Sequence, residues 1–136
     1  MGLELVSPGK NPPEEINVII EIPKDSEPVK YEVDKETGAI FVDRILSTPM
    51  RYPCNYGYVP STKILAVPVS KIFSGYAHVE DIAQVSSHWL ERIGHFFEHY
   101  KDLEKGKWVK LDGWGGAAEA KQILIEAHQR HLDSKA

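Results

Sequence analysis

The chain has 136 residues, of which 42% are hydrophobic and 26% are charged. This length predicts a single domain over residues 1–136, and the composition excludes a disordered or fibrous protein. A formal net charge of −4 argues against a broad basic surface for nucleic acid. The lone cysteine, Cys54, excludes an internal disulfide. With no apolar run of membrane-spanning length and no basic, apolar leader, we expect a cytoplasmic protein away from membranes.

The first half of the chain is punctuated by Pro and Gly and predicts short strands. Alternating or apolar segments bounded by turn residues indicate strands at 16–22, 28–33, 39–44, 52–59 and 64–69. In the first of these, the alternation places Ile16, Val18, Ile20 and Ile22 on one face, and Asn17, Ile19 and Glu21 on the other. The turn between the second and third segments predicts a hairpin.

The second half predicts two helices around one further strand. Apolar residues with helical spacing run from Trp89 to Leu103, after a capping serine and before Gly106. Residues 107–111 alternate as a last strand, and a second helix is expected from Ala117 to about Leu132. The order predicts an α+β fold, a small antiparallel barrel carrying helices on one side.

Charged residues inside the strands are the most informative feature. Glu21, Lys30, Glu32 and Arg44 fall on or at the ends of three short segments. If these strands are neighbours, the cations could hold an anion while the carboxylates steer a hard cation. The alternative is a solvated strand face with ordinary cross-strand ion pairs.

Tyrosines and histidines offer weaker signals. Tyr52, Tyr56 and Tyr58 could donate hydrogen bonds to phosphate, stack on bases, or simply pack in a barrel. Tyr100 lies on the apolar stripe of the first helix with Lys101 beside it. The His-x-x-Glu-His spacing of residues 95–99 resembles an inverted zincin motif, but a solvated helix edge is the simpler interpretation.

Several segments together resemble the family I soluble inorganic pyrophosphatases of bacteria. The matching blocks, in chain order, are Glu21-Ile-Pro23, Lys30-Tyr31-Glu32, residues 34–38, Val42-Asp43-Arg44, residues 52–58, residues 95–101 and residues 107–110. The resemblance runs through nearly the whole chain. It implies a five-stranded, OB-like twisted barrel with flanking helices and Mg²⁺-dependent hydrolysis of inorganic diphosphate. It also implies a cytoplasmic homo-oligomer, commonly a hexamer.

The resemblance assigns roles to individual residues. It implies phosphate ligands at Lys30, Arg44, Tyr56, Tyr100 and Lys101. It places Glu21 and Glu32 beside metal-bound waters, and Tyr52 beside the attacking nucleophile, so that Tyr52 and Glu32 are the expected catalytic pair. A compact, multiply charged anion needs such fixed cations and donors.

One part of the family pattern is absent. The Asp-x-Asp-Pro-x-Asp signature and a later aspartate pair, which supply the direct metal ligands, are missing, and no Asp or Glu occurs from residue 45 to residue 79. An internal segment is therefore expected to be missing between about residues 62 and 63, leaving an incomplete OB-like barrel with two flanking C-terminal helices. The segment could be omitted from the written sequence, the chain could be a true deletion, or it could be a remnant with a new role.

We expect a truncated inorganic pyrophosphatase of poor or no activity that self-associates, as a hexamer or as a strand-exchanged dimer. One alternative is a non-catalytic oligomerising remnant that at most binds phosphate. The other is an OB-type binder of single-stranded nucleic acid that stacks bases on the three tyrosines, which the net charge disfavours.

Overall fold

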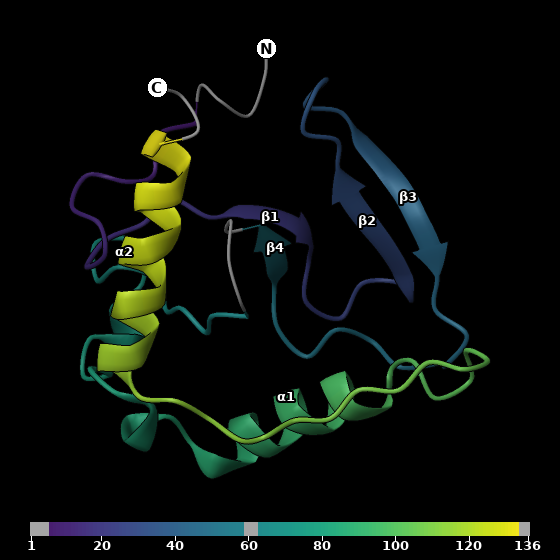
Figure 1. The fold of residues 1–136 in the computed structure, drawn as a ribbon. Coiled ribbons are helices and arrows are strands. Elements are labelled where there is room, and N and C mark those ends of the chain that lie inside the picture. Colours follow the sequence, from purple (N-terminus) through teal and green to yellow (C-terminus); the bar gives the residue numbers. More distant parts are fainter. Residues whose placement is uncertain (1–5, 59–62, 134–136) are drawn as a thin grey trace. The chain divides into compact units, whose positions relative to one another are not determined.

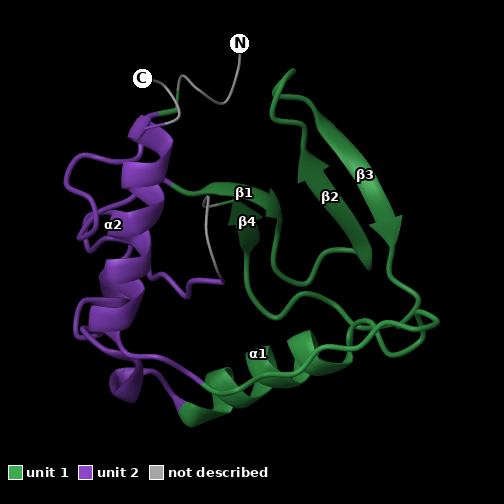
Figure 2. Ribbon diagram, viewed as in Figure 1, with its two compact units in different colours: residues 1–6, 18–58, 87–113 green, residues 7–17, 59–86, 114–136 purple. Residues whose placement is uncertain are grey.

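The computed structural model describes residues 6–58 and 63–133, which divide into two compact units (Figure 2). Of the described residues, the first unit contains residue 6 and residues 18–58 and 87–113, and the second contains residues 7–17, 63–86 and 114–133. Each unit is described by itself below. The expectation that residues 1–136 form a single domain stays a prediction.

Two antiparallel strand pairs form the sheets of the first unit (Figure 1). Strand β1 (Ile19–Ile22) pairs with β4 (Tyr56–Tyr58), and β2 (Val29–Val33) pairs with β3 (Ile40–Ile45). Short antiparallel sheets and two helices make this an α+β fold with an unclosed barrel, and this confirms the predicted fold class.

Both strand pairs contain an irregularity at a charged residue. Ile20 pairs with Gly57 and Ile22 with Tyr56, so that Glu21 is an extra residue in β1. Because a bulge breaks the two-residue alternation, Ile22 is fully buried while Ile20 is exposed. The prediction that these isoleucines share one face was therefore wrong.

Helix α1 (Ser87–His99) packs its apolar stripe against the segment that leads into β4. Ile93, Phe96 and Phe97 are buried, and the ring of Phe96 lies 4.6 Å from that of Tyr52. These three positions of the predicted apolar stripe are therefore confirmed. The prediction was wrong for Leu103, which is exposed.

The end of α1 explains this error. The Tyr100 N–H still donates to the Phe96 carbonyl, at 2.8 Å, but the chain then leaves the helix in tight turns. Gly106, expected as the residue just past the helix, has a positive φ of 76° and ends these turns instead.

Helix α2 (Ala117–Asp133) organises the second unit with two single-turn 3₁₀ helices, η2 (Ser74–Tyr76) and η3 (Ile82–Gln84). The Ala117 N–H at the start of α2 donates to the Asp81 carboxylate, at 2.9 Å. This bond is the main cause that lowers the pKa of Asp81. A negative charge at a helix N-terminus is stabilising, so the contact fixes where α2 begins.

Two predicted strands are absent from the described residues. Residues 64–69 and 107–111 form neither strand nor helix. A strand is stable only with a partner, and these runs find none in the described part of the chain. Residues 16–18 and 52–55 likewise lie outside the strands, and residues 59–62, beside the predicted break, lie outside the described residues.

Candidate anion-binding site

The core of the candidate site is a cluster of two cations around one carboxylate on the β2–β3 hairpin. Lys30 and Arg44 are cross-strand partners. The Lys30 Nζ lies 2.9 Å from Asp43 Oδ2, and the Arg44 Nε lies 2.7 Å from the same oxygen. We call these three residues the cation cluster.

A β-bulge in β3 produces this arrangement. Lys30 pairs with Arg44 while its neighbour Tyr31 pairs with Val42, so Asp43 is the extra residue. A bulge turns two consecutive side chains toward the same side of a strand. Asp43 and Arg44 therefore both reach the face that carries Lys30, which regular alternation would forbid.

The electrostatics of the cluster hold all three groups in their charged forms. Hydrogen bonds from Lys30 and then Arg44 lower the pKa of Asp43. Burial works against the charge of Lys30, but its bonds to Asp43 and Glu32 raise its pKa overall. The bond to Asp43 is also the main cause that raises the pKa of Arg44.

The two predicted carboxylates lie around this hairpin but differ in their contacts. Glu32 accepts a hydrogen bond from the Lys30 ammonium, at 3.1 Å, and so joins the cation cluster. Glu21 instead accepts from the backbone N–H of Val33, at 2.8 Å. The Glu21 side chain thus ties the β1 bulge to the end of β2.

Glu104 supplies a second anionic contact that the sequence analysis missed. Its Oε2 lies 3.4 Å from the Arg44 Nη1 and 2.6 Å from the Lys107 Nζ. The hydrogen bond from Lys107 is the first cause that lowers the pKa of Glu104. Its other oxygen, Oε1, is buried and has no hydrogen-bond partner among the residues that the structure describes.

Tyr52 is a buried aromatic residue near the cation cluster. It is 1% exposed, and its ring lies 5.4 Å from the ring of Tyr56. Burial raises the pKa of Tyr52, nearby Tyr100 and Tyr56 add to the shift, and the positive charge of Arg44 opposes it. The phenol is therefore protonated at neutral pH. A ring this buried cannot stack a base, which argues against the nucleic-acid alternative.

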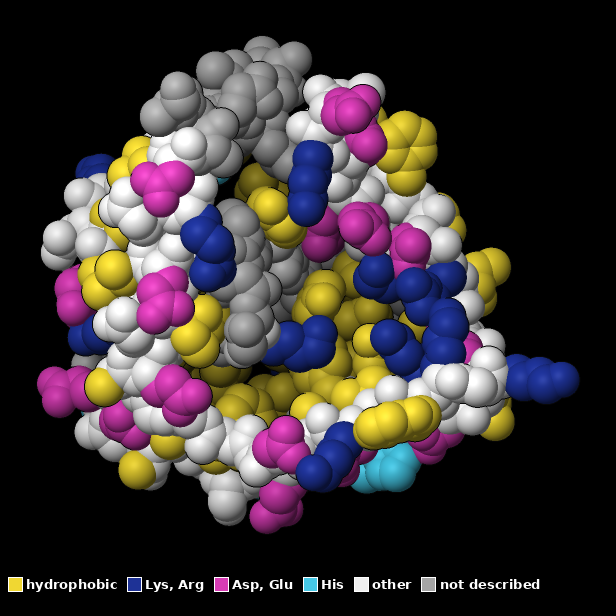
Figure 3. Space-filling view, in the orientation of Figure 1, with side chains coloured by type: hydrophobic (Ala, Val, Ile, Leu, Met, Phe, Trp, Pro, Cys, Tyr) yellow, Lys and Arg dark blue, Asp and Glu magenta, His cyan; other side chains and the backbone are white. Residues whose placement is uncertain are grey.

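Tyr100 and Lys101 follow α1 directly. Tyr100 is buried and its ring stacks on Phe96, with 5.2 Å between centroids and 20° between planes. The Lys101 Nζ lies 5.3 Å from the Tyr100 ring. The structure thus connects Tyr100 through Phe96 to Tyr52 and places Lys101 on the same aromatic group. Figure 3 shows Lys and Arg side chains gathered over the β2–β3 hairpin and the segment after α1.

Sequence signals for the missed residues exist in part. Asp43 and Arg44 are two adjacent charges within the apolar strand Ile40–Ile45, and such a break in alternation can indicate a bulge. Glu104 is an acid set among lysines after a helix, which is a common surface pattern. Only its contact with Arg44, sixty positions away, makes it part of the site.

The carboxylates present do not fit a full Mg²⁺ site. Among the described residues, no three His, Cys, Asp or Glu side chains lie close enough together to hold a metal ion. Glu32, Asp43 and Glu104 each face a cation of their own chain, and Glu21 faces a backbone amide. Mg²⁺ prefers carboxylate and water oxygens, and each of these carboxylates is already engaged with another group.

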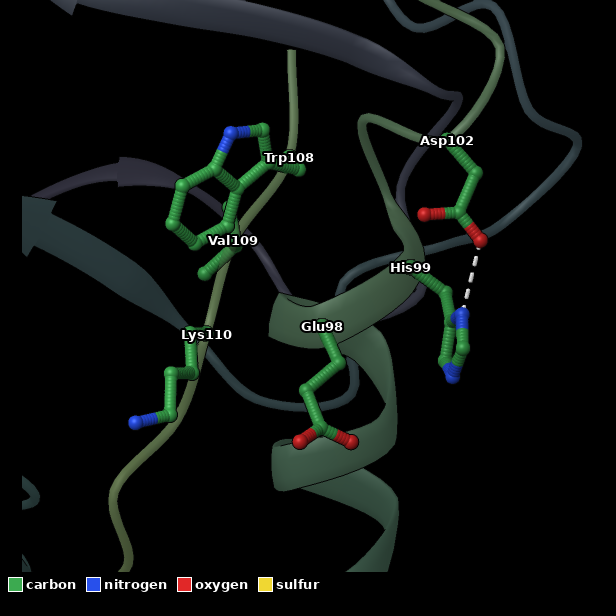
Figure 4. A pocket seen from close by; sticks show the side chains of 6 residues that line it. All are labelled: Glu98, His99, Asp102, Trp108, Val109 and Lys110. Carbon is green, nitrogen blue, oxygen red and sulfur yellow. Dashed lines mark hydrogen bonds and ion pairs between the residues drawn. The ribbon is translucent and has the colours of Figure 1, made fainter.

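A separate hollow lies at the end of α1 and holds none of the predicted phosphate ligands (Figure 4). It measures about 530 Å³ and is lined by Glu98, His99, Asp102, Trp108, Val109 and Lys110. The His99 Nδ1 lies 2.7 Å from the Asp102 carboxylate. The hollow mixes both signs of charge and is open, so we place the candidate site at the cation cluster instead.

Fold and site together define a small α+β protein with an unclosed barrel and a cluster of fixed cations. No helix in the described ranges has both the length and the apolar character to cross a bilayer. The inorganic pyrophosphatase family profile matches residues 18–63 and 61–132. The chain belongs to the inorganic pyrophosphatase family, an enzyme class that hydrolyses inorganic diphosphate.

Individual relatives agree with this assignment. The inorganic pyrophosphatase of Xanthomonas campestris pv. campestris is 65% identical over 173 aligned positions, covering 96% of this chain and 97% of the relative. That of Xylella fastidiosa strain 9a5c is 63% identical and covers 98% and 99%. The inorganic pyrophosphatase structure from Coxiella burnetii has a TM-score of 0.84 at 38% identity and covers 92% of this chain and 99% of that one.

Proposed function

We propose that this chain binds inorganic diphosphate at the cation cluster, with Tyr56, Tyr100 and Lys101 as further donors. The observation that carries the proposal is the shared contact of Lys30 and Arg44 with Asp43, at 2.9 and 2.7 Å. One carboxylate oxygen shared by two cations leaves N–H donors on both of them for a further anion. Charge-assisted bonds from Lys and Arg to phosphate oxygens are among the stronger hydrogen bonds.

The roles of the neighbouring groups follow from their surroundings. Tyr52, protonated and buried, provides a rigid wall and one O–H donor beside the anion. Its expected place near the nucleophile remains part of this proposal. Glu32 and Glu21 hold the hairpin in register through Lys30 and the Val33 N–H. Fixed donors of this kind stabilise charge without reorganisation.

We further propose that the family reaction, Mg²⁺-dependent hydrolysis, is poor or absent in this chain. Two observations support an internal segment missing between about residues 62 and 63. The alignment with the Xanthomonas relative spans 173 positions while the chain has 136 residues. The family profile also matches in two stretches that meet at residues 61–63. With no acid from residue 45 to residue 79, the chain lacks the carboxylates expected to hold Mg²⁺ directly.

The proposal also includes a cytoplasmic, self-associating protein. A barrel that is not closed leaves apolar surface and strand edges that a partner subunit can cover. A non-catalytic, oligomerising remnant that binds phosphate stays the second candidate. The missing acidic residues favour that candidate, and the preserved cation cluster favours the pyrophosphatase.

Calorimetric titration with diphosphate tests the binding, with and without Mg²⁺. Lys30→Gln and Arg44→Gln should each weaken binding about tenfold or more, as expected for the loss of a bond to a charged group. Lys110→Gln is the matched control, since Lys110 is an exposed lysine that pairs with Asp112 away from the cluster. Equal affinities for all three variants would overturn the proposed site.

Steady-state hydrolysis assays with Mg²⁺ test the reaction. The protein first needs a verified intact mass of 15.3 kDa, since a larger mass would mean that an acidic segment exists. At the verified mass we expect diphosphate binding with little or no turnover. Rapid Mg²⁺-dependent turnover would contradict the proposed loss of activity while leaving the binding site intact.

A further inference from the structure

The last turn of α1 carries two histidines that lie outside the candidate anion-binding site. His95 and His99 are four residues apart, and their ring centroids lie 4.5 Å apart with 42° between the planes. Side chains at this spacing lie one turn apart on the same face of a helix. Both residues are exposed. The two imidazoles therefore form a close pair that an ion can reach from solvent.

A carboxylate sets the orientation of one ring of this pair. The His99 Nδ1 lies 2.7 Å from the Asp102 Oδ2. An ionised carboxylate only accepts hydrogen bonds, so in the neutral ring Nδ1 carries the hydrogen and Nε2 keeps its lone pair. Figure 4 shows this second nitrogen on the side of the ring away from Asp102. Histidines that bind metals in proteins almost always have such a partner on their other nitrogen.

The position of the pair on the helix also favours a cation. His99 is the last residue of α1, and the C-terminal end of a helix carries a partial negative charge that stabilises cations. The carboxylate of Asp102 adds a negative charge beside the His99 ring. Among the described residues, no third His, Cys, Asp or Glu side chain completes a closed metal site. An ion bound by this pair would therefore keep water in its remaining coordination positions.

We propose that His95 and His99 together bind one divalent transition-metal ion of the class that prefers imidazole, such as Ni²⁺, Cu²⁺ or Zn²⁺. Imidazole nitrogens suit these ions, whereas Mg²⁺ prefers oxygen ligands. Zinc–nitrogen bonds are about 2.0–2.1 Å long, so rings with centroids 4.5 Å apart can each give one nitrogen to the same ion. The site is separate from the cation cluster and takes a different class of ion from the Mg²⁺ of the family reaction.

Calorimetric titration of the full chain with Ni²⁺, without diphosphate, tests the proposal. We expect saturable binding of one ion per chain that excess Mg²⁺ does not displace. His95→Gln and His99→Gln should each weaken it about tenfold or more, and Asp102→Ala about tenfold, since loss of an outer partner alone costs roughly that much. His128→Gln is the matched control, because it removes an imidazole from α2, where His128 and His131 are three residues apart. That variant should bind Ni²⁺ like wild type.

Thermal denaturation followed by circular dichroism gives a second readout and shows that each variant is folded. An ion bound only by the folded chain stabilises it, so Ni²⁺ should raise the melting temperature of wild type and His128→Gln but not of His95→Gln or His99→Gln.

Nuclear magnetic resonance of the wild type locates the ion without any substitution. Substoichiometric Cu²⁺, which is paramagnetic, should broaden the imidazole signals of His95 and His99 before those of the other histidines. Three results would each overturn the proposal: no saturable Ni²⁺ binding by wild type, unchanged binding in both α1 variants, or loss of binding in His128→Gln. None of them would affect the proposed binding of diphosphate, which is measured separately at the cation cluster.

Discussion

The ammonium group of Lys30 lies 2.9 Å from the carboxylate of Asp43, the extra residue in the β3 bulge. Without the bulge, Asp43 and Arg44 would lie on opposite faces of the strand. The bulge therefore brings the side chains of the cation cluster together on one face of the hairpin. It also leaves the other face free of charge, so one backbone feature accounts for both surfaces of the hairpin.

Asp43→Asn should reduce stability at neutral pH and remove part of its acid dependence. The folded-state pKa of Asp43 lies below its ordinary value because Lys30 and Arg44 stabilise the carboxylate. Its contribution is complete above the unfolded pKa, about 3.9, and disappears as pH falls through the folded value. We expect a loss of about 1 kcal/mol at pH 7, shrinking toward zero in acid.

Urea denaturation of wild type and variant at a series of pH values measures this difference. Asp112→Asn is the control, because Asp112 pairs with Lys110 on an exposed segment. That variant should match wild type at every pH. A constant gap between Asp43→Asn and wild type down to strongly acidic pH would show that the effect is not electrostatic.

Tyr52 is expected to tolerate loss of its hydroxyl far better than loss of its ring. The ring contacts Tyr56 and Phe96, so Tyr52→Ala should destabilise the fold by about 3–5 kcal/mol, as other buried aromatic truncations do. Tyr52→Phe should cost about 1 kcal/mol. Thermal denaturation compares the two variants, and equal losses would contradict the packing role.

The ionisation of Tyr52 gives an independent readout. Burial raises its pKa, so Tyr52 should stay protonated while exposed tyrosines ionise. In an ultraviolet titration to alkaline pH, Tyr52→Phe and wild type should therefore show the same number of tyrosines that ionise at the ordinary pH. If that variant loses a group that titrates near pH 10, the ordinary value for tyrosine, Tyr52 is not buried as described.

Gly57→Ala should disrupt the β1–β4 pair, and Gly94→Ala should not. A Cβ at Gly57 would collide with the backbone carbonyl of Ile19, and backbone atoms cannot move aside cheaply. At Gly94, inside α1, the nearest atom is the Leu111 Cδ1 at 3.8 Å, an ordinary contact. Gly57→Ala should therefore cost roughly 2 kcal/mol or more, while Gly94→Ala should gain up to about 1 kcal/mol from helix propensity.

Chemical denaturation of both glycine variants under one condition checks the contrast. Each variant adds the same single methyl group, so a difference in sign isolates the local backbone environment. Destabilisation of similar size in both would contradict the close approach of β4 to β1 at this position.

How far the sequence predicts the structure depends on whether an element carries its own partner. The hairpin of residues 28–33 and 39–44 and helix α1 are specified by nearby residues, and the structure contains both within a residue or two, apart from the end of α1. Residues 64–69 and 107–111 have equally good strand patterns but no partner among the described residues. A strand-like sequence pattern alone cannot show that the strand with which it would pair is missing.

The candidate site shows the same limit at the level of side chains. Lys30 and Arg44 were expected together because neighbouring strands bring alternate residues to one face. Strand alternation did not place Asp43 on the same face as Lys30, because its position depends on a bulge that shifts the alternation by one residue. Glu104 could not be assigned, since nothing local predicts a contact with a strand sixty positions earlier.

Glu104→Gln should strengthen diphosphate binding at low ionic strength. The carboxylate lies near Arg44 and Lys107 and competes with an incoming anion for both. The amide keeps the shape and removes the charge, so we expect roughly two- to fivefold tighter binding with a steeper dependence on salt. Glu98→Gln removes an equal charge at the separate hollow and should leave affinity nearly unchanged. Calorimetry at low and high salt separates the cases. Weaker binding by Glu104→Gln would mean that its hold on the position of Arg44 outweighs its competition with the anion.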